Sequence, residues 1–332
     1  MSSSRVVWEQ VSRMGVFSTY SPMAAWSSGG TSAMTCSTFP ASPATSIRGA
    51  SRTRRTPGMA RSPERTSSPF SDSAEDNLTD KSALSVADIL EFANTVDLSL
   101  IEDLLEAQLS CNLAIAEEGL RNDWGANVGS VILGESQDSP KSDAKAWAAA
   151  GSDARMSGCE MPVVILSGSG NQGITASVPV ARYAHHLGAS REKLYRALLV
   201  SDLITVEQKS GIGRLSAYCG AVSAGVGAGA GIAYLLDGSL SAISHTIVNA
   251  VAILSGTICD GAKPSCAAKI AASVDAGILG YQMYAHRQQF RGGEGIVTKG
   301  VDATIRNIGI LAKEGMRQTD ETILDIMTHR CD

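Results

Sequence analysis

Residues 214–260 read RLSAYCGAVSAGVGAGAGIAYLLDGSLSAISHTIVNAVAILSGTICD and contain two uncharged runs of 22 residues each, 215–236 and 238–259. Each run is long enough to cross a bilayer. The first run, however, consists mainly of Gly and Ala rather than Leu, and no basic loop or aromatic belt flanks it. Because small residues let helices approach closely, we expect two buried central helices of a bundle and no membrane segment.

Apolar residues recur at helical spacing on both sides of this stretch. The predicted helices cover residues 84–93, 100–116, 140–157, 172–187, 190–206, 212–236, 240–256, 264–287, 301–316 and 319–330. One short segment, 161–166, is a candidate strand. The sequence therefore predicts a mainly α fold, a helical bundle with buried Gly- and Ala-rich central helices and an irregular N-terminal arm.

The arm, residues 1–77, differs from the rest of the chain in composition. It contains neither Leu nor Lys, and up to residue 71 it carries eight Arg against two acidic residues. The remainder of the 332 residues then holds 20 basic and 31 acidic residues, a net charge of −11. We predict an arm over 1–77 and a helical domain over 78–332. Three interpretations of the arm stay open: an organellar leader, a disordered basic tail, or a wrong start or shifted reading frame.

Charge and cysteine content exclude several classes of protein. An acidic domain without a basic cluster is a poor nucleic-acid binder, because phosphate neutralisation needs clustered Lys and Arg. The chain has seven cysteines, an odd number, and we expect no secretory signal before them. This pattern is typical of a reduced, intracellular protein rather than a disulfide scaffold. We therefore expect a cytoplasmic protein.

Two cysteines flank a predicted helix break. Residues 255–269 read SGTICDGAKPSCAAK, so that Cys259 and Cys266 stand seven residues apart. The Asp-Gly and Lys-Pro steps interrupt the helix, so we expect Cys259 to end one helix and Cys266 to begin the next. Cys219, on the preceding buried helix, would face them in an antiparallel pair. Three thiolates suit an iron–sulfur cluster or a zinc ion; the alternative is that each is a small core residue.

A glycine-rich loop, SGSGNQG at 167–173, leads into another apolar helix. Backbone N–H groups at the start of a helix form an anion site, and a carboxylate would fit it. The candidate binding residues in this loop are Ser167, Ser169, Asn171 and Gln172. No Gly-Lys-Ser/Thr follows, so the loop is not a phosphate-binding P-loop. An ordinary glycine-rich turn remains the alternative.

Six segments of the sequence have a common counterpart. They are SDARMSG at 152–158, SGSGNQGITA at 167–176 followed by Pro179, RLSAYCG at 214–220, SGTICDGAKPSCAAK at 255–269, GGEGIV at 292–297 and QTD at 318–320. In this order and spacing they resemble the L-cysteine desulfidase family, whose catalytic half is related to the α chain of the iron–sulfur L-serine dehydratases. The resemblance covers about residues 78–330.

The resemblance implies a lyase that converts L-cysteine and water to pyruvate, ammonia and sulfide without pyridoxal phosphate. It assigns Cys219, Cys259 and Cys266 to a [4Fe–4S] cluster whose open iron acts as a Lewis acid on the substrate carboxylate and leaving sulfur. Asn171 and its loop match the substrate-binding loop.

Three cations are weaker candidates for holding the substrate carboxylate: Arg155, Lys263 and Lys269. Each is equally interpretable as part of a structural ion pair or as a solvated surface charge.

Two other functions stay open. One is L-serine dehydratase on the same scaffold. The other is a truncated, inactive cluster-binding pseudoenzyme, because the family's N-terminal Cys-Thr-Glu-Pro motif is not found in this sequence and Cys36 stands in MTCSTFP. As partners we expect a small amino-acid substrate and further copies of the same chain, with no nucleic acid and no membrane.

Overall fold

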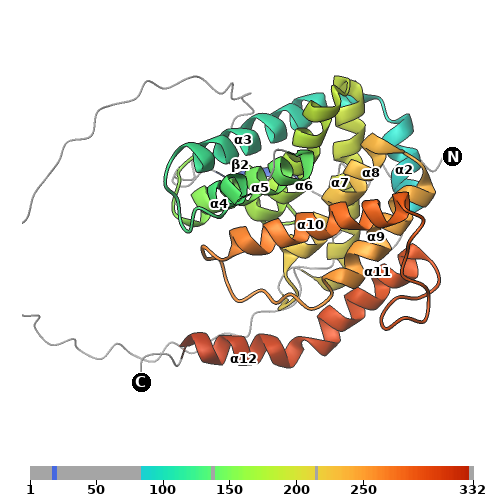
Figure 1. Cartoon of the computed structure of the whole chain (residues 1–332). Helices are drawn as coiled ribbons and strands as arrows, with labels where there is room; N and C mark the ends of the chain where they lie inside the picture. Colours follow the sequence, from blue (N-terminus) through green and yellow to red (C-terminus); the bar gives the residue numbers. More distant parts are fainter. Residues whose placement is uncertain (1–16, 21–83, 136–138, 214–215, 329–332) are drawn as a thin grey trace, which may run out of the picture. The chain divides into compact units, whose positions relative to one another are not determined.

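The computed structural model describes residues 17–20, 84–135, 139–213 and 216–328 (Figure 1). The fold is mainly α, as predicted, and its two short strands are β1 (Phe17–Tyr20) and β2 (Val163–Leu166). The helices are α2 (Val86–Thr95), the 3-10 helix η3 (Leu98–Leu100), α3 (Glu102–Arg121), α4 (Val128–Glu135), α5 (Pro140–Met156), α6 (Gly170–Leu187), α7 (Arg191–Ile212), α8 (Gly220–Leu236), α9 (Leu240–Ile253), α10 (Cys266–Ala285), α11 (Val301–Ile310), the π-helix η4 (Leu311–Gly315) and α12 (Arg317–Thr328). Apart from β1, the predicted arm lies outside the described residues.

Helix α8 is the central helix of the bundle and packs against α6, α7, α9 and α10 (Figure 1). Its glycines lie where a neighbouring backbone comes closest. A Cβ atom at Gly229 would stand 2.6 Å from the Cα of Gly277 on α10, and one at Gly227 would stand 2.5 Å from the carbonyl oxygen of Ser201 on α7. Such distances leave no room for a side chain, which explains why the run is rich in Gly.

Several boundaries differ from the prediction. Helix α7 continues to Ile212, and Gly213, with φ of 91°, ends it in a conformation that glycine adopts easily. Helix α8 therefore begins at Gly220 and not at residue 212. Helix α4 was not predicted, and the expected helix over 301–316 turns into a π-helix after Ile310.

Strand β2 confirms the candidate strand at 161–166 and pairs antiparallel with β1, with Leu166 opposite Phe17. The buried side chain of Asn112 on α3 holds it from another direction. Its Oδ1 accepts from the backbone N–H of Val164 at 2.9 Å, and its Nδ2 donates to the carbonyl of Val164 at 3.3 Å. The strand is thus fixed next to the glycine-rich loop that follows it.

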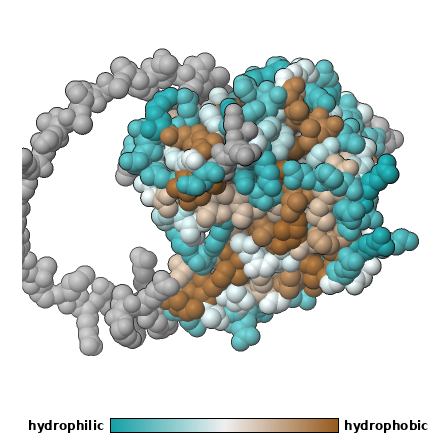
Figure 2. All heavy atoms as spheres, viewed as in Figure 1, coloured by the Kyte–Doolittle hydropathy of each residue, from teal (hydrophilic) through white to brown (hydrophobic). Residues whose placement is uncertain are grey.

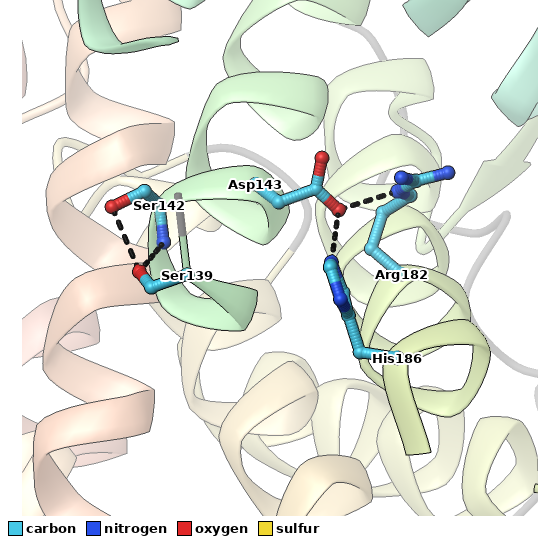
Figure 3. A network of polar contacts seen from close by, with 5 residues as sticks. All are labelled: Ser139, Ser142, Asp143, Arg182 and His186. Carbon is cyan, nitrogen blue, oxygen red and sulfur yellow. Dashed lines mark hydrogen bonds and ion pairs between the residues drawn. The ribbon is translucent and has the colours of Figure 1, made fainter. Parts of the chain in front are cut away.

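A polar cluster joins α5 to the C-terminal half of α6 (Figure 3). The carboxylate of Asp143 accepts from Nε of Arg182 at 2.6 Å and lies 3.0 Å from Nε2 of His186. The guanidinium of Arg182 also lies 4.1 Å from the ring centre of Trp147. Together these contacts brace α6 at the end opposite to the glycine-rich loop.

Apolar side chains also reach the surface, as Figure 2 shows for the face in view. The exposed ones include Ile310 and, on α12, Leu324, Ile326 and Met327. None of the described helices combines the length and the apolar character needed to cross a membrane.

The close packing of α8 predicts that Gly229→Ala destabilises the protein. The new methyl group would collide with the backbone of Gly277, and overpacking of this kind costs about 1–3 kcal/mol in the free energy of unfolding. Urea denaturation measures the change. The matched control is Gly134→Ala on α4, where a Cβ has open space and the better helix propensity of Ala stabilises by up to about 1 kcal/mol. Equal effects of the two substitutions would contradict this account.

A buried carboxyl predicts a pH dependence of stability. Burial, together with the neighbouring carboxylate of Asp302, raises the pKa of Glu207 to about 9. The folded state therefore binds a proton that the unfolded state releases near its ordinary pKa of about 4.3, so stability falls as the pH rises between these values. Glu207→Gln removes this proton uptake. We expect the unfolding free energy of the variant to rise relative to the natural chain from about pH 5 to 9, by up to about 1.4 kcal/mol per pH unit. A constant difference across that range would show that Glu207 is ionised in the fold.

Candidate functional site

A single antiparallel bridge between Tyr218 and Ile258 creates the site. The backbone N–H of Cys219 donates to the carbonyl of Thr257 at 3.1 Å, and that of Cys259 donates to the carbonyl of Ala217 at 2.6 Å. The two cysteines, forty residues apart, are thereby held side by side. Their positions correct the sequence-based expectation. Cys219 is the N-cap of α8 and does not lie within a helix, and Cys259 lies in the loop beyond α9 and does not end that helix.

The thiols of Cys219 and Cys259 form a hydrogen-bonded pair. Cys219 is buried and Cys259 is exposed. Cys219 donates its S–H to Cys259, which lowers the pKa of the Cys259 thiol to about 6, with further help from the backbone N–H of Gly261 and the charge of Lys269. The same hydrogen bond and burial raise the pKa of Cys219. The pair therefore presents one thiolate to solvent, and a thiolate is the form that binds metals.

The third cysteine, Cys266, begins α10, as the sequence predicted. Its Sγ lies 3.6 Å from the carbonyl oxygen of Gly261, in the same loop that carries Cys259. The ammonium group of Lys269 interacts electrostatically with Cys219, Cys259 and Cys266, so the three thiols surround one region. Within the described ranges no three His, Cys, Asp or Glu side chains are close enough to hold a metal ion. A cluster of four irons and four sulfides is larger than one ion, so its thiolates stand further apart.

Two residues of the predicted binding loop, Asn171 and Gln172, make contacts outside the loop. Asn171 accepts a hydrogen bond at Oδ1 from Arg155 at 3.3 Å. Gln172 packs on the start of α8, since a Cβ atom at Gly220, next to Cys219, would stand 2.6 Å from Nε2 of Gln172. Gln172 therefore lies next to the residue that follows Cys219, and Arg155 contacts the neighbouring Asn171.

The two serines of the loop have local roles. Ser167 takes a positive φ of 48°, and Ser169 is the N-cap of α6 and exchanges backbone hydrogen bonds with Leu166. Among the described residues, no hydrogen bond joins either serine to the cysteines.

The two predicted lysines near Cys259, Lys263 and Lys269, both interact with the carboxylate of Asp260. Lys263 forms an ion pair with Asp260, and Lys269 donates to Oδ1 of Asp260 at 2.5 Å and to the carbonyl of Ile258 at 2.9 Å. These contacts lower the pKa of Asp260 to about 2. Both lysines thus brace the loop around Cys259, which agrees with their interpretation as structural ion pairs.

The sequence analysis missed two buried polar residues around the pair, Tyr218 and Lys209. The hydroxyl of Tyr218 and Oε1 of Gln172 have no hydrogen-bond partner among the residues described, although Gln172 was predicted for another reason. Lys209, near the end of α7, is 8% exposed, and its amine interacts electrostatically with Cys219 and Cys259. No sequence pattern marked Lys209, because it follows Glu207 and Gln208 in an ordinary polar stretch.

The buried groups around the thiol pair are compatible with a bound metal cluster. Orphaned polar atoms such as the Tyr218 hydroxyl need a partner, which a bound group or water would supply. Three helix starts also meet here: α6 at Gly170, α8 at Gly220 and α10 at Cys266. Their N–H groups carry partial positive charge and favour an anionic group. These features define a helical protein with a thiolate site at converging helix N-termini.

Comparison with known proteins places the chain in a family. Residues 10–325 match the family described as serine dehydratase alpha chain, and the chain belongs to it. The predicted resemblance to that α chain is thereby confirmed. No solved structure is significantly similar to the chain.

Three relatives illustrate the similarity, each named UPF0597 protein. That of Desulfitobacterium hafniense is 60% identical over 260 residues, 78% of this chain and 60% of the relative. That of Lachnoclostridium phytofermentans is 54% identical over 253 residues, 76% of this chain and 61% of the relative. That of Bacteroides fragilis is 39% identical over 263 residues, 78% of this chain and 61% of the relative. The chain thus spans about three fifths of the length of the curated relatives it matches.

The thiol pair predicts selective reactivity in protein stripped of metal. Cys259 should react with iodoacetamide with a midpoint near pH 6, the pKa set by the Cys219 hydrogen bond. In Cys219→Ala that donor is lost, so the midpoint should move to higher pH, towards the ordinary thiol value of about 8.5. Mass spectrometry of the alkylated peptides measures each site. Cys159, whose pKa is raised by burial, is the internal control and should react only at higher pH. An unchanged midpoint for Cys259 in Cys219→Ala would refute the pairing.

Proposed function

We propose that the protein is an L-cysteine desulfidase-like lyase that uses a [4Fe–4S] cluster and no pyridoxal phosphate. The observation that carries the proposal is the Cys219–Cys259 thiol pair, held at the starts of three helices with Cys266 on the same loop. Thiolates are the usual ligands of iron–sulfur clusters. Membership of the serine dehydratase alpha chain family supports the proposal, because that family is typically iron–sulfur dependent.

In the proposed reaction, L-cysteine loses a proton from Cα and sulfide from Cβ. The resulting aminoacrylate tautomerises and takes up water to give pyruvate and ammonia. Cys219, Cys259 and Cys266 would hold the cluster, which supplies a Lewis acid when bound. The partial positive charges at the starts of α6, α8 and α10 favour the negative charge of that group and of the substrate.

The glycine-rich loop supplies polar groups for the substrate. Arg155 donates to Oδ1 of Asn171 and so fixes the orientation of this amide. No described residue accepts a hydrogen bond from the side-chain N–H groups of Asn171, which are available for a ligand. Gln172, wedged against Gly220, keeps this loop next to Cys219. Lys263 and Lys269 act indirectly, by holding Asp260 and thereby the loop of Cys259.

The test is anaerobic purification from iron-replete cells. We expect broad absorption from thiolate-to-iron charge transfer, and release of equimolar sulfide and pyruvate from L-cysteine. Cys259→Ser and Cys266→Ser should lose both, because each removes a cluster ligand. The control Cys111→Ser, on α3, should keep both. A colourless, iron-free natural chain would refute the proposal.

A second candidate substrate is L-serine, which membership of the serine dehydratase alpha chain family favours. Hydroxide is a poorer leaving group than hydrosulfide, so the same site has to stabilise more charge on the departing atom. Ammonia release from equal concentrations of L-serine and L-cysteine decides between them. A faster reaction with L-serine would make the protein an L-serine dehydratase.

We also propose that the protein works in the cytoplasm and as a homo-oligomer, and that it binds neither nucleic acid nor membranes. The exposed thiol of Cys259 supports a reducing compartment. The exposed apolar residues of α12 support association between copies. The net charge of −5 opposes binding to nucleic acid.

An inactive, cluster-binding protein is the remaining alternative, and cluster absorption without turnover of either amino acid would favour it.

A further inference from the structure

A hollow of about 350 Å³ lies between α5, α9 and α10, and none of its lining residues belongs to the thiol site. Its apolar part consists of Ile253, the last residue of α9, and of Ala271, Ala272, Ala276 and Leu279 on α10. Its polar part consists of Lys145 on α5 and Asp275 on α10. Figure 2 shows apolar surface along the course that α10 takes in Figure 1. Mostly apolar hollows of this size with a few polar groups are typical of small-molecule sites.

Small side chains on α10 create the hollow. Helices α5 and α10 pack closely through alanines, since Ala149 shares one apolar cluster with Ala267 and Ala271. Further along α10, Ala272 and Ala276 each present only a methyl group to the hollow. The protein's own side chains therefore leave space between the three helices, and this space opens to the surface beside the exposed Ala272.

Two lysines of α5 share one carboxylate at the edge of the hollow. Nζ of Lys145 lies 2.7 Å from Oδ1 of Asp275, and Nζ of Lys141 lies 3.2 Å from the same oxygen. The two lysines are four residues apart, so they lie on one face of α5. Among the described residues neither lysine has another ion-pair partner. Two ammonium groups that share one carboxylate leave one positive charge uncompensated.

This surplus charge is partly shielded from water. The side chains of Lys145 and Asp275 are 21% and 35% exposed, and charges interact more strongly at such positions than in bulk water. An anion at this edge of the hollow is therefore attracted, and a cation is repelled. The apolar lining favours a hydrocarbon group, because its burial removes apolar surface from water. Charge and lining together select an anion that carries a short hydrocarbon chain.

We propose that the hollow between α5, α9 and α10 is a binding site for a small apolar carboxylate. The carboxylate of the ligand lies against the ammonium group of Lys145, and its hydrocarbon chain lies on the alanines of α10, with Ile253 and Leu279 beside it. This site is separate from the proposed lyase function, because it uses no residue of the thiol site.

The experiment measures the binding of four compounds to the full chain by calorimetry, near neutral pH and at low ionic strength. Hexanoate carries both the charge and the hydrocarbon chain. Acetate lacks most of the chain, hexanol lacks the charge, and hexylamine carries the opposite charge. We expect hexanoate to bind most tightly, and acetate to bind at least about tenfold more weakly because it buries fewer methylene groups.

Two substitutions of Lys145 test the charge. Lys145→Met keeps the length and removes the charge, and Lys145→Arg keeps the charge. Lys145→Met should weaken hexanoate by about fivefold, because a partly exposed charge contributes less than a buried charge-assisted hydrogen bond. Hexanol should change by less than about twofold, because it carries no charge. Lys145→Arg should bind hexanoate better than Lys145→Met. The matched control is Lys193→Met, an exposed lysine of α7, which should match the natural chain.

A third substitution tests the hollow itself. Ala272 is exposed, so Ala272→Phe fills the hollow without strain in the core. It should weaken both hexanoate and hexanol by at least about fivefold, because the new ring takes the place of the hydrocarbon chain. The matched control is Ala285→Phe, at an exposed position in the last turn of the same helix, and it should leave the binding of both compounds unchanged.

Four results would overturn the inference. The first is the absence of saturable binding of hexanoate to the natural chain. The second is equal weakening of hexanoate and hexanol in Lys145→Met, which would indicate a structural role of this lysine. The third is equal binding of hexanoate by Lys145→Arg and Lys145→Met. The fourth is unchanged binding of hexanoate in Ala272→Phe. If Ala272→Phe then also changes the oligomeric mass, the hollow is an interface between copies of the chain.

Discussion

The close approach of α8 to its neighbours is the constraint on which the rest of the structure depends. Backbone packs directly on backbone where Gly229 meets Gly277 and where Gly227 meets Ser201. At such a distance the relative position of two helices has little freedom, because any side chain would force them apart. The start of α8, with Cys219, is therefore fixed relative to α10, which begins with Cys266. A site made of residues on different helices gains its precision from this rigid packing.

Electrostatics then shapes the site on this scaffold. Three helix N-termini, the ammonium groups of Lys209 and Lys269, and the donated S–H of Cys219 all favour negative charge near Cys259. Opposing charge is limited, since Asp260 is held by two lysines. Positive charge next to an accessible thiolate is compatible with the anionic metal cluster and the anionic substrate of the proposed function.

Membership of the serine dehydratase alpha chain family indicates the type of reaction more clearly than it indicates the substrate. L-Serine and L-cysteine differ in one atom of the leaving group, and both carry the same carboxylate and ammonium groups. Residues proposed to bind those shared groups, such as Asn171, would serve either substrate. Discrimination between L-serine and L-cysteine depends on how the site stabilises the departing oxygen or sulfur atom. The chain spans about three fifths of its matched relatives, so the activity of the whole protein remains a proposal.

The sequence alone determined the helical class, most helix positions, the strand at 163–166 and the start of α10 at Cys266, because apolar periodicity and breakers such as Lys-Pro act locally. The sequence also identified the three cysteines as candidate ligands and the loop of Asn171 as a candidate binding loop. The tertiary structure alone decided that Cys219 and Cys259 share a hydrogen bond and that Lys263 and Lys269 pair with Asp260. The cysteine pairing joins residues 40 positions apart. Such pairings depend on how closely whole helices pack, and no local pattern encodes that distance.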